Sequence, residues 1–433
     1  MRWKSDTYSG WGRALKADGD LARPERISAL KGLPPTPAFG ARRSYGDACL
    51  NSDGRAIDMT RLDRILSFDP ETGEVEVEAG VPIGELARLF APRGWIPTVM
   101  PGTGFATVGG CIGMDVHGKN HHRDGSFGNH VTAIRLIHQG KAKTITPDKN
   151  AALFKATLGG LGQTGLIVSA TLQMTPISGQ AMSVRESRVS NLDEHLALLD
   201  ASDARYTVGW IDATARDGAL GRGIVEEGEH SRDPAPKPGR AKSVPVDAPR
   251  FTLARPVVKA FNARYFARIP EEGRTRTRSI ADFFFPLDRV QNWNRLYGKR
   301  GFHQFQYVLP PDQTHALRRM IETIARSGLA SPLAVLKRLG PEAAGFLSFP
   351  MEGYTLAVDF PNRSKAADLI RKLGDQTAQA GGRIYLAKDS LADGATIKAM
   401  YPGHADWQAE AQKADPEGLL MTDLIRRLDL RSA

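Results

Sequence analysis

Hydrophobic and polar positions alternate along residues 74–79, where three apolar residues are separated by Glu74, Glu76 and Glu78. A period of two predicts a β-strand with one face in the interior and the glutamates in solvent. In residues 82–95 the apolar positions recur every three or four residues, which predicts an amphipathic helix. The same two periods predict further strands over residues 55–62, 65–81, 130–147 and 166–176 and a helix over residues 150–158.

From Ile177 onward the pattern of strands and helices changes. Their alternation predicts an antiparallel sheet with helices on one side, an α+β arrangement. Residues 218–249 are rich in Gly, Pro and charge, and we expect a mobile loop there. Strands are expected over residues 205–213 and 302–310 and, as a pair, within 348–361, with helices over 312–328 and 365–382.

Residues 256–269 form a basic amphipathic segment. A surface helix docked on its own domain is the first interpretation of this pattern. A contact with a membrane surface is the alternative.

Length and charge narrow the class of protein. A chain of 433 residues exceeds one ordinary core, which indicates two domains. The formal net charge of +10 favours anionic partners, including phosphate-bearing substrates and acidic lipid surfaces. Because the charge is spread along the chain without a basic tail, we do not expect a nucleic-acid partner.

The cysteine count and the first residues bear on the compartment. Cys49 and Cys111 alone cannot make a disulfide framework or a cysteine-rich zinc site. The first twenty residues lack the apolar core of a signal peptide, and no segment reaches the run of roughly 18 apolar residues that spans a bilayer. We therefore expect a cytoplasmic protein, with membrane association limited to a surface contact.

A dinucleotide-binding motif is matched in letters only. Residues 160–165 read GLGQTG, the G-x-G-x-x-G pattern. That fingerprint needs a strand before it and a helix after it, so that the pyrophosphate meets a helix N-terminus. Here the predicted order is reversed, so NAD binding by this motif is not expected.

Two other glycine-rich stretches carry more weight. Residues 39–48 (FGARRSYGDA) and 100–131 place Gly, Ser and Thr where backbone amides can approach an anion closely. Tight turns in a twisted sheet are the alternative. The second stretch contains DVHGKNHH, residues 115–122, whose histidines suggest metal binding. Gly118 interrupts any helix that would pair His117 with His121, and no acidic or cysteine cluster completes a ligand set, so we predict no metal site.

The order of these motifs resembles the vanillyl-alcohol-oxidase-type family of FAD-binding proteins. The resemblance rests on RSYGD, TVGG, DVHGKNHH with GSFGNHV, and the LFKATLGGLGQTGLI stretch. It continues with FPLD, GFHQFQYVLP, LSFP, VDFP, AKDS and MYP, and it covers nearly the whole chain.

The resemblance implies an α+β fold with a PCMH-type two-part FAD-binding domain and an antiparallel-sheet substrate (cap) domain. Residues 1–176 would form the FAD-binding domain, residues 177–380 the cap, and residues 381–433 a return to the first domain. In this view DVHGKNHH is a wall beside the flavin. The positions implied to contact FAD are Phe39, Gly40, Ala41, Arg42, Arg43, Ser44, Tyr45, Gly46, Asp47, Gly102, Thr107, Val108, Gly109, Gly110, Met114, Asp115, Val116, His117, Ile167 and Tyr385.

The resemblance also implies where an alcohol would react. Lys388 and His117 are the expected catalytic residues. An imidazole suits proton transfer near neutral pH, whereas a lysine first needs its pKa lowered by burial, and the base stays open between the two. The expected substrate-binding residues are Tyr45, Lys119, Asn294, Gln304, Gln306, Lys337 and Lys388.

The implied activity is FAD-dependent oxidation of the 2-hydroxyl of a polyprenyl-phosphoryl pentose to a keto sugar. This would be the first half of an epimerisation that supplies cell-envelope arabinose, completed by a separate NAD(P)H-dependent reductase partner. A soluble sugar-alcohol or aldonolactone oxidase of the same family is one alternative. A FAD-binding scaffold without catalysis is another, which retention of Lys388 and His117 disfavours.

Three departures from the family pattern matter. Many members tether the flavin through a histidine beside RSYGD, where this chain has Ser44 and Tyr45, so we expect non-covalent FAD. Ala357 stands where some members carry a cysteine, which changes the pocket shape and its reactivity toward thiol reagents. Phe284 and Phe285 make the stretch before FPLD more apolar than in other members.

Overall fold

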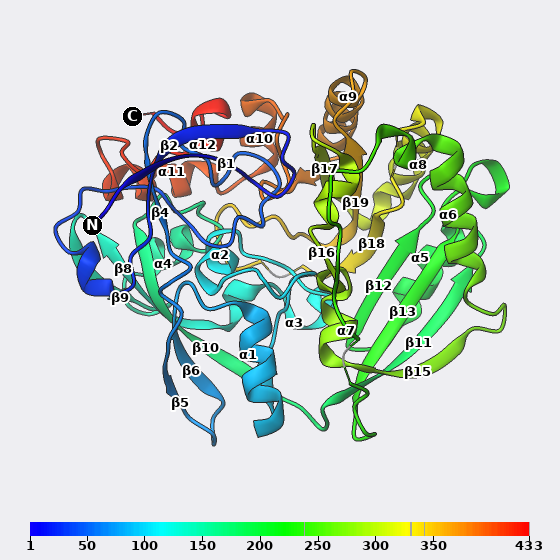
Figure 1. Ribbon diagram of the computed structural model, residues 1–433, viewed down its shortest axis with the longest axis horizontal. Helices are drawn as coiled ribbons and strands as arrows, with labels where there is room; N and C mark the ends of the chain where they lie inside the picture. The colour runs from blue at the N-terminus through cyan, green and yellow to red at the C-terminus, as the bar shows by residue number, and fades with distance from the viewer. Residues whose placement is uncertain (238, 330, 342, 433) are drawn as a thin grey trace.

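The computed structural model describes residues 1–432 except 238, 330 and 342, and it shows two parts side by side (Figure 1). Strands β1 to β10 lie in one part, together with the C-terminal helices, and strands β11 to β20 lie in the other. Most neighbouring strands pair antiparallel. The predicted α+β class is confirmed. The residue bounds predicted for the domains stay predictions; β10 ends at Pro176 and β11 begins at Ala181.

Two sheets build the first part. One has the order β1 (Lys4–Ser9), β2 (Lys16–Ala22), β4 (Arg55–Asp58) and β3 (Ala38–Phe39). The other has the order β5 (Ile65–Phe68), β6 (Glu74–Glu78), β10 (Leu166–Pro176), β8 (Val131–His138) and β9 (Lys141–Ile145), and β7 (Trp95–Pro97) also pairs with β10. The helices of this part are α1 (Ile83–Phe90), α2 (Val108–Gly113), α3 (His121–Asp124) and α4 (Ala151–Thr157).

The C-terminal helices pack against the first part of the chain. They are α10 (Gly394–Met400), α11 (His404–Ala414) and α12 (Asp423–Arg427), and α11 contacts α4. Arg427 joins the two ends of the chain, since its guanidinium donates to Asp47 at 2.7 Å and to Asp389 at 2.8 Å. This return carries residues 385–388 to the junction of the two parts.

One large sheet builds the second part within the described residues. Its order is β15 (Arg274–Ser279), β11 (Ala181–Val189), β13 (Gly223–Ser231), β12 (Tyr206–Ile211), β18 (Ala334–Leu339), β19 (Gly353–Pro361), β17 (Phe302–Leu309) and β20 (Arg383–Ile384). The helices are α5 (Leu192–Ala201), α6 (Arg255–Ala267), α7 (Ile280–Phe284), α8 (Thr314–Ser327) and α9 (Ala366–Gln379). A short pair, β14 (Lys242–Ser243) and β16 (Val290–Gln291), lies apart from this sheet.

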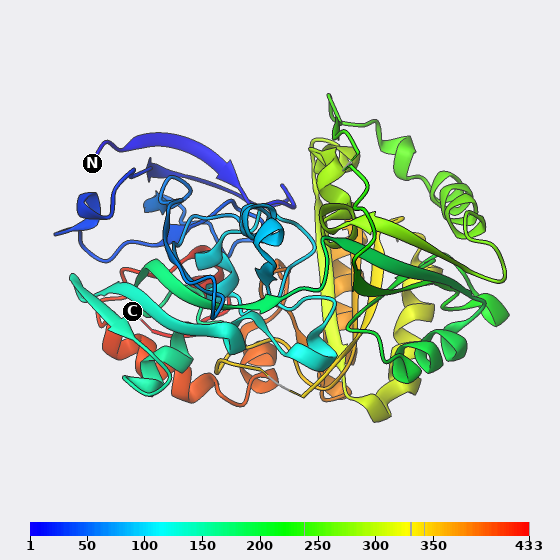
Figure 2. The same cartoon turned by 90° about the horizontal axis from the view of Figure 1, so that it is seen from below.

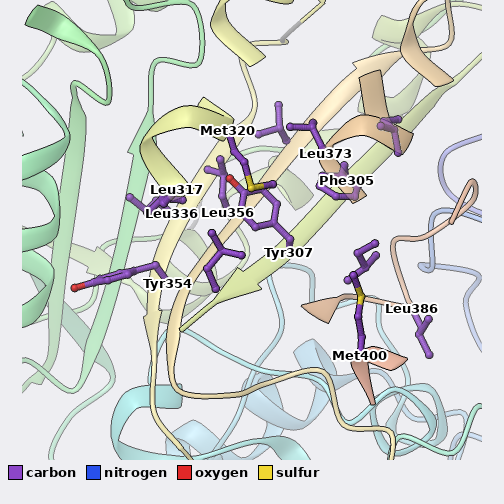
Figure 3. Close-up of a cluster of buried hydrophobic side chains, with 14 of the residues drawn as sticks. Phe305, Tyr307, Leu317, Met320, Leu336, Tyr354, Leu356, Leu373, Leu386 and Met400 are labelled. Carbon is purple, nitrogen blue, oxygen red and sulfur yellow. The ribbon is translucent and has the colours of Figure 1, made fainter. Parts of the chain in front are cut away.

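The helical face of this sheet holds a large apolar core (Figure 3). Phe305 and Tyr307 of β17 point toward Met320 of α8 and Leu373 of α9, and all four are buried. Burying a side chain of this size contributes roughly 1.5–3 kcal/mol. Because successive residues of a strand point to opposite faces, the even-numbered residues of β17 are left for the other face.

Three predictions from the pattern were wrong. Residues 223–231 are not part of a loop but form β13, which pairs on both sides. Its first three residues are buried, and its Glu226 pairs with Arg278 at 2.9 Å. The expected strand pair within 348–361 is the single strand β19, since Arg383 instead binds the carbonyls of Ser348 and Pro350. Glu78 does not face solvent: it is fully buried and paired with Arg64 at 2.6 Å.

Candidate active site

The floor of the site is a row of side chains on one face of three neighbouring strands. Gln304 and Gln306 lie two residues apart on β17, so both point to the face opposite the core. Pairing with β19 places Gln304 beside Asp359 and Gln306 beside Ala357. Lys337 of β18 shares this face, because the residue two positions before it pairs with Ala357.

A cavity of about 580 Å³ lies between this floor and the glycine-rich loops of the first part. That volume is within the range of roughly 300–1,000 Å³ common for ligand and cofactor sites. Residues 38–45, residues of the 101–117 stretch and residues 161–167 contribute to the walls, and Tyr385 and Lys388 come from the C-terminal return.

The walls fit a cofactor held by backbone groups. Gly102 and Gly162 line the cavity, and a Cβ built at either position meets no protein atom within 4 Å. Residues 41–44 also line it, and their backbone amides donate to no acceptor in the described part of the chain. Open backbone surface and unpaired amides suit the diphosphate of a dinucleotide, so these residues fit FAD. At Gly40 a Cβ would lie 2.0 Å from Thr107 Oγ1, so only glycine fits where the loops meet.

Two half-buried lysines line the cavity. Lys388 places its Nζ 3.8 Å from the centre of the Tyr45 ring. Burial lowers the pKa of Lys388 to about 7; Asp359 raises it and Lys337 lowers it further. Burial also lowers the pKa of Lys337 to about 7, with the charge of Lys119 acting in the same direction. Both side chains can therefore exchange a proton near neutral pH.

His117 lies against the floor as a neutral imidazole. The amide of Gln306 lies 3.1 Å from His117 Nε2 and an equal distance from the hydroxyl of Thr355. When that amide donates, Nδ1 is the protonated ring nitrogen. Burial holds the pKa of His117 well below its usual value, and Lys337 and other nearby cationic groups add to this effect. The ring packs 5.3 Å from that of Tyr385.

Asp359 is a buried acid that sequence reasoning did not single out. Its carboxylate accepts hydrogen bonds from Gln304 Nε2 at 2.5 Å and from the hydroxyl of Tyr297 at 2.9 Å. Burial raises the pKa of Asp359 to about 7, against these hydrogen bonds and the charge of Lys388. The quoted VDFP motif contained the residue, but only the strand register shows that it faces the site.

Asp288 is a second acidic residue at the site that sequence reasoning did not single out. It lines the cavity and accepts hydrogen bonds from Thr103 Oγ1 and the amide of Gly104, both at 2.7 Å. This joins the second part of the chain to a glycine-rich loop of the first. The FPLD motif held the signal, but without the loop contact it could not be assigned a role.

Most of the predicted residues come together at the cavity. Those that line it are Phe39, Gly40, Ala41, Arg42, Arg43, Ser44, Tyr45, Gly102, Thr107, Gly109, Gly110, Met114, Val116, His117, Ile167, Gln304, Gln306, Lys337, Tyr385 and Lys388. Ala357, one of the departures from the family pattern, also lines it. Which of them contact a cofactor or a substrate stays a prediction.

Six predicted residues do not line the cavity, namely Gly46, Asp47, Val108, Asp115, Lys119 and Asn294. Asp115 is fully buried and holds the wall, because its carboxylate accepts from Ser126 Oγ and the Gly128 amide, each at 2.8 Å. Lys119 donates to the carbonyl of Phe283 at 2.6 Å, and Asn294 donates to that of Trp11 at 3.1 Å.

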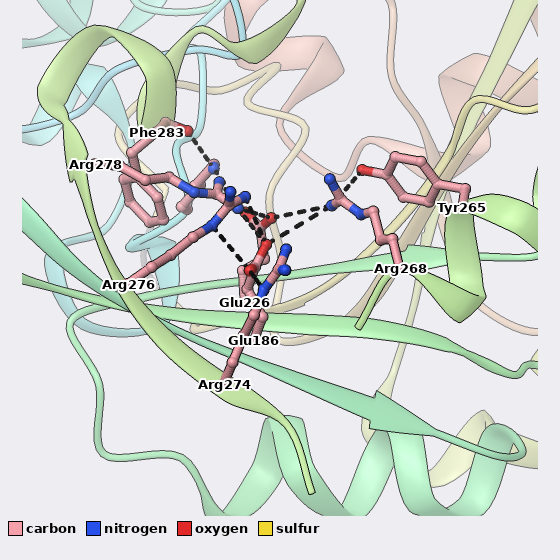
Figure 4. A network of polar contacts seen from close by, with 9 residues as sticks. Glu186, Glu226, Tyr265, Arg268, Arg274, Arg276, Arg278 and Phe283 are labelled. Atoms are coloured by element: carbon pink, nitrogen blue, oxygen red, sulfur yellow. Dashed lines mark hydrogen bonds and ion pairs between the residues drawn. The ribbon is translucent and has the colours of Figure 1, made fainter. Parts of the chain in front are cut away.

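Lys119 lies over the ring of Phe283, beside a cluster of charges near one edge of the sheet, which Figure 4 shows. Glu186 and Glu226 lie there among arginines, and Arg278 contacts both. Lys119 Nζ is 3.9 Å from Glu226, and burial lowers its pKa to about 8. The lysine therefore ties the histidine-rich loop to the sheet.

The other histidines of the DVHGKNHH region make structural hydrogen bonds. His121 Nδ1 accepts from the amide of Gly340, His122 bonds the carbonyl of Ala204, and His130 bonds that of Asp124. Helix α3 begins at His121, so His117 is not on that helix. Among the described residues, no three His, Cys, Asp or Glu side chains are grouped in a way that could hold a metal.

No helix in the described part of the chain is long and apolar enough to cross a bilayer.

Comparison with known proteins agrees with the fit to FAD. Residues 29–147 match the FAD binding domain family. Over 97% of its length the chain is 37% identical to decaprenylphosphoryl-β-D-ribose oxidase of Mycolicibacterium smegmatis, of which it covers 97%. It is 24% identical to L-gulono-1,4-lactone dehydrogenase of Mycobacterium tuberculosis, over 98% of the chain and 99% of that protein. It is 30% identical to D-arabinono-1,4-lactone oxidase of Yarrowia lipolytica, over 32% of the chain and 27% of that protein.

Proposed function

The chain belongs to the family of FAD-dependent oxidoreductases that includes decaprenylphosphoryl-β-D-ribose oxidase, and from this premise we propose that it oxidises the 2-hydroxyl of a polyprenyl-phosphoryl pentose to the 2-keto sugar. One observation carries the proposal: two half-buried lysines with lowered pKa, Lys388 and Lys337, and the amides of Gln304 and Gln306 line a single cavity that also fits FAD. This set offers a base, a cation for a phosphate and hydrogen bonds for sugar hydroxyls.

FAD, when bound, supplies the acceptor for the electrons and the carbon-bound hydrogen of the alcohol. Lys388 takes the hydroxyl proton, because its lowered pKa of about 7 leaves a large neutral fraction near neutral pH. His117 already receives the amide of Gln306, so it orients the floor and packs beside Tyr385. Lys337 meets the phosphate, whose negative charge favours the ammonium form. Gln304 is held by Asp359 and presents its remaining amide groups to the sugar.

The product sets the chemistry of the next step. A 2-keto pentose that stays linked to its lipid carrier can be reduced on the opposite face, which inverts that carbon. An NAD(P)H-dependent reductase is therefore the expected partner, and the pair completes an epimerisation that supplies arabinose for the cell envelope. A lipid-linked substrate also places this chain at a membrane surface, through residues 256–269.

FAD is held without a covalent bond in this proposal. The RSYGD loop offers Ser44 and Tyr45 to the cavity in place of the histidine that tethers the flavin in many members of the family. Precipitation with acid tests this point: the yellow colour is expected in the supernatant, and colour that stays with the pellet would contradict it.

Anaerobic mixing tests the reaction itself. Holoenzyme mixed with polyprenyl-phosphoryl ribose is expected to lose its visible flavin absorbance within one turnover, and free pentoses and aldonolactones are expected to leave the absorbance unchanged. Bleaching by free polyols or lactones would instead identify a sugar-alcohol or aldonolactone oxidase. Absence of bleaching with any of these alcohols would indicate a FAD-binding scaffold.

A further inference from the structure

The exposed hydrophobic side chains of the described residues are concentrated in one region. Six of the ten large ones lie between residues 246 and 296, namely Val246, Phe251, Val257, Phe261, Val290 and Leu296. Phe251 and Val246 are 68% and 69% exposed. We call these six residues the apolar patch. Exposed apolar side chains gathered in this way mark an interaction surface more often than scattered ones do.

Helix α6 shows how its part of the patch arises. Val258 and Asn262 are buried, and Asn262 donates to Asp212 at 2.7 Å, which docks the helix on its own domain. Val257 and Phe261 are four residues apart and lie on the outward side, 45% and 51% exposed. The helix is therefore docked on its own domain through its buried side. Its outward side still carries exposed apolar residues.

The apolar patch is continuous with the mouth of the cavity. Val290 belongs to both, since it is 36% exposed and lines the cavity. Its strand β16 pairs with β14, which leads through Val246 and the short helix Arg250–Leu253 into α6. That short helix also contacts the segment that carries Leu296. In Figure 2, the green segments from β14 to α6 run along the upper edge of the molecule.

Positive charge surrounds the apolar patch. Residues 240–264 contain six Lys or Arg and one acidic residue, Asp247, which gives this stretch a net charge of +5. Asp247 is already paired with Arg13 at 2.5 Å. On α6, Arg255, Lys259 and Arg264 are exposed. Apolar side chains interleaved with exposed cations fit the interface of an anionic bilayer, where the rings enter the headgroup region and the cations meet phosphates.

We propose that the apolar patch docks this protein on an anionic lipid bilayer, so that the mouth of the cavity opens at the level of the lipid headgroups. The occupant is a lipid surface because the patch joins apolar and basic residues at the entrance of the cavity. The reason for docking rests on the proposed lipid-linked substrate, whose tail stays in the bilayer while its sugar enters. The docking itself does not depend on turnover and is tested separately.

The test is sedimentation of the holoenzyme with vesicles. Binding is expected to vesicles of phosphatidylcholine with phosphatidylglycerol, to be weaker by at least about ten-fold on phosphatidylcholine alone, and to fall as salt is raised. The double variant Phe251→Ser/Phe261→Ser and the charge variant Lys259→Glu/Arg264→Glu are each expected to weaken binding by at least about ten-fold. Leu66→Ser/Leu419→Ser is the matched control, because both of these side chains are 44% exposed and lie outside the patch.

Each outcome has one meaning. Binding by the patch variants equal to that of the unchanged protein, equal binding to neutral and anionic vesicles, or no vesicle binding overturns the proposal. Circular dichroism and flavin content of the variants confirm that they fold. Turnover of a short-chain, water-soluble prenyl-phosphoryl pentose is expected to be unchanged in the patch variants. If no lipid-linked pentose is oxidised but vesicles are bound, the proposed function fails while the docking stands.

Discussion

The two sides of the cavity use different chemistry. The loop side, around residues 39–45 and 100–110, presents backbone amides and glycines with open space beyond them. The sheet side presents titratable and amide side chains on adjacent strands, with Asp359 buried and Lys337 half-buried among them. The loop side can hold any ligand that offers an anion to the backbone, whereas the sheet side determines which reaction occurs.

The difference also separates binding from turnover in experiments. A change on the loop side should alter flavin content first, because the cofactor depends on close approach of the backbone. A change on the sheet side should alter rate or pH dependence while flavin stays bound. Four variants test this separation, and Lys388→Met is expected to have the largest effect.

Replacing Lys388 with methionine removes the proposed base and keeps the volume of the side chain. We expect kcat to fall by about 10²–10⁴-fold, the usual contribution of a positioned acid or base, with flavin content unchanged. Steady-state kinetics and flavin absorbance measure both. Lys398→Met is the control, since Lys398 pairs with Asp429 and does not line the cavity. Full activity of Lys388→Met would show that Lys388 is not the base.

Replacing Gly102 with valine fills the loop side. The new side chain meets no protein atom within 4 Å at Cβ, so the apoprotein should keep its melting temperature while FAD affinity falls by at least about ten-fold. Gly218→Val is the control, because Gly218 has equally open space and lies outside the cavity. Isothermal titration of the apoprotein with FAD gives the affinity, and equal affinities of the two variants would contradict the loop-side role.

Replacing Asp359 with asparagine should move the pH profile. Activity is expected to rise as the pH increases through about 7, because Lys388 must be neutral to accept a proton. The negative charge of Asp359 raises the pKa of Lys388, so its removal should shift this limb to lower pH, on the order of one unit. The profile of kcat/KM against pH measures the shift. Asp368→Asn changes an 81% exposed side chain and should leave the pH profile unchanged. A shift of the profile to higher pH in Asp359→Asn would contradict the expected effect of Asp359 on the pKa of Lys388.

Replacing Ala357 with cysteine should have the smallest effect. The extra sulfur atom enters the floor beside Gln306, and we expect kcat/KM to change by no more than about three-fold. The unchanged protein should resist thiol reagents, because Cys49 and Cys111 are both buried. The variant should be labelled and inactivated, as measured by mass spectrometry and residual activity. Inactivation of the unchanged protein by the same reagent would show that a native cysteine is accessible.

The sequence allowed the loop side to be predicted better than the sheet side. Glycines and RSYGD are local signals, since tight turns and close approach need those residues at fixed spacing. Asp359 escaped notice because its partners, Gln304 and Tyr297, come from other segments and meet it only through strand register and packing.

Two charged residues have partners that the sequence did not reveal. The glutamates of β13 resembled a solvated loop, yet Glu226 is held by Arg278 and lies in the sheet. Lys119 appeared in a pocket motif, yet its ammonium is directed to Phe283 and Glu226. In both cases the partner is a residue far away in the chain, and a single sequence does not reveal such pairs.

A crystal structure of the complex with FAD and a non-reactive 2-deoxy-2-fluoro analogue of the prenyl-phosphoryl pentose tests the central claim most directly. The account predicts the flavin in the cavity, its diphosphate at the amides of residues 41–44, and C2 of the sugar near Lys388 with Nζ about 3 Å from the fluorine, within hydrogen-bond reach. A sugar bound away from Lys388, or a flavin held elsewhere in the chain, would contradict it.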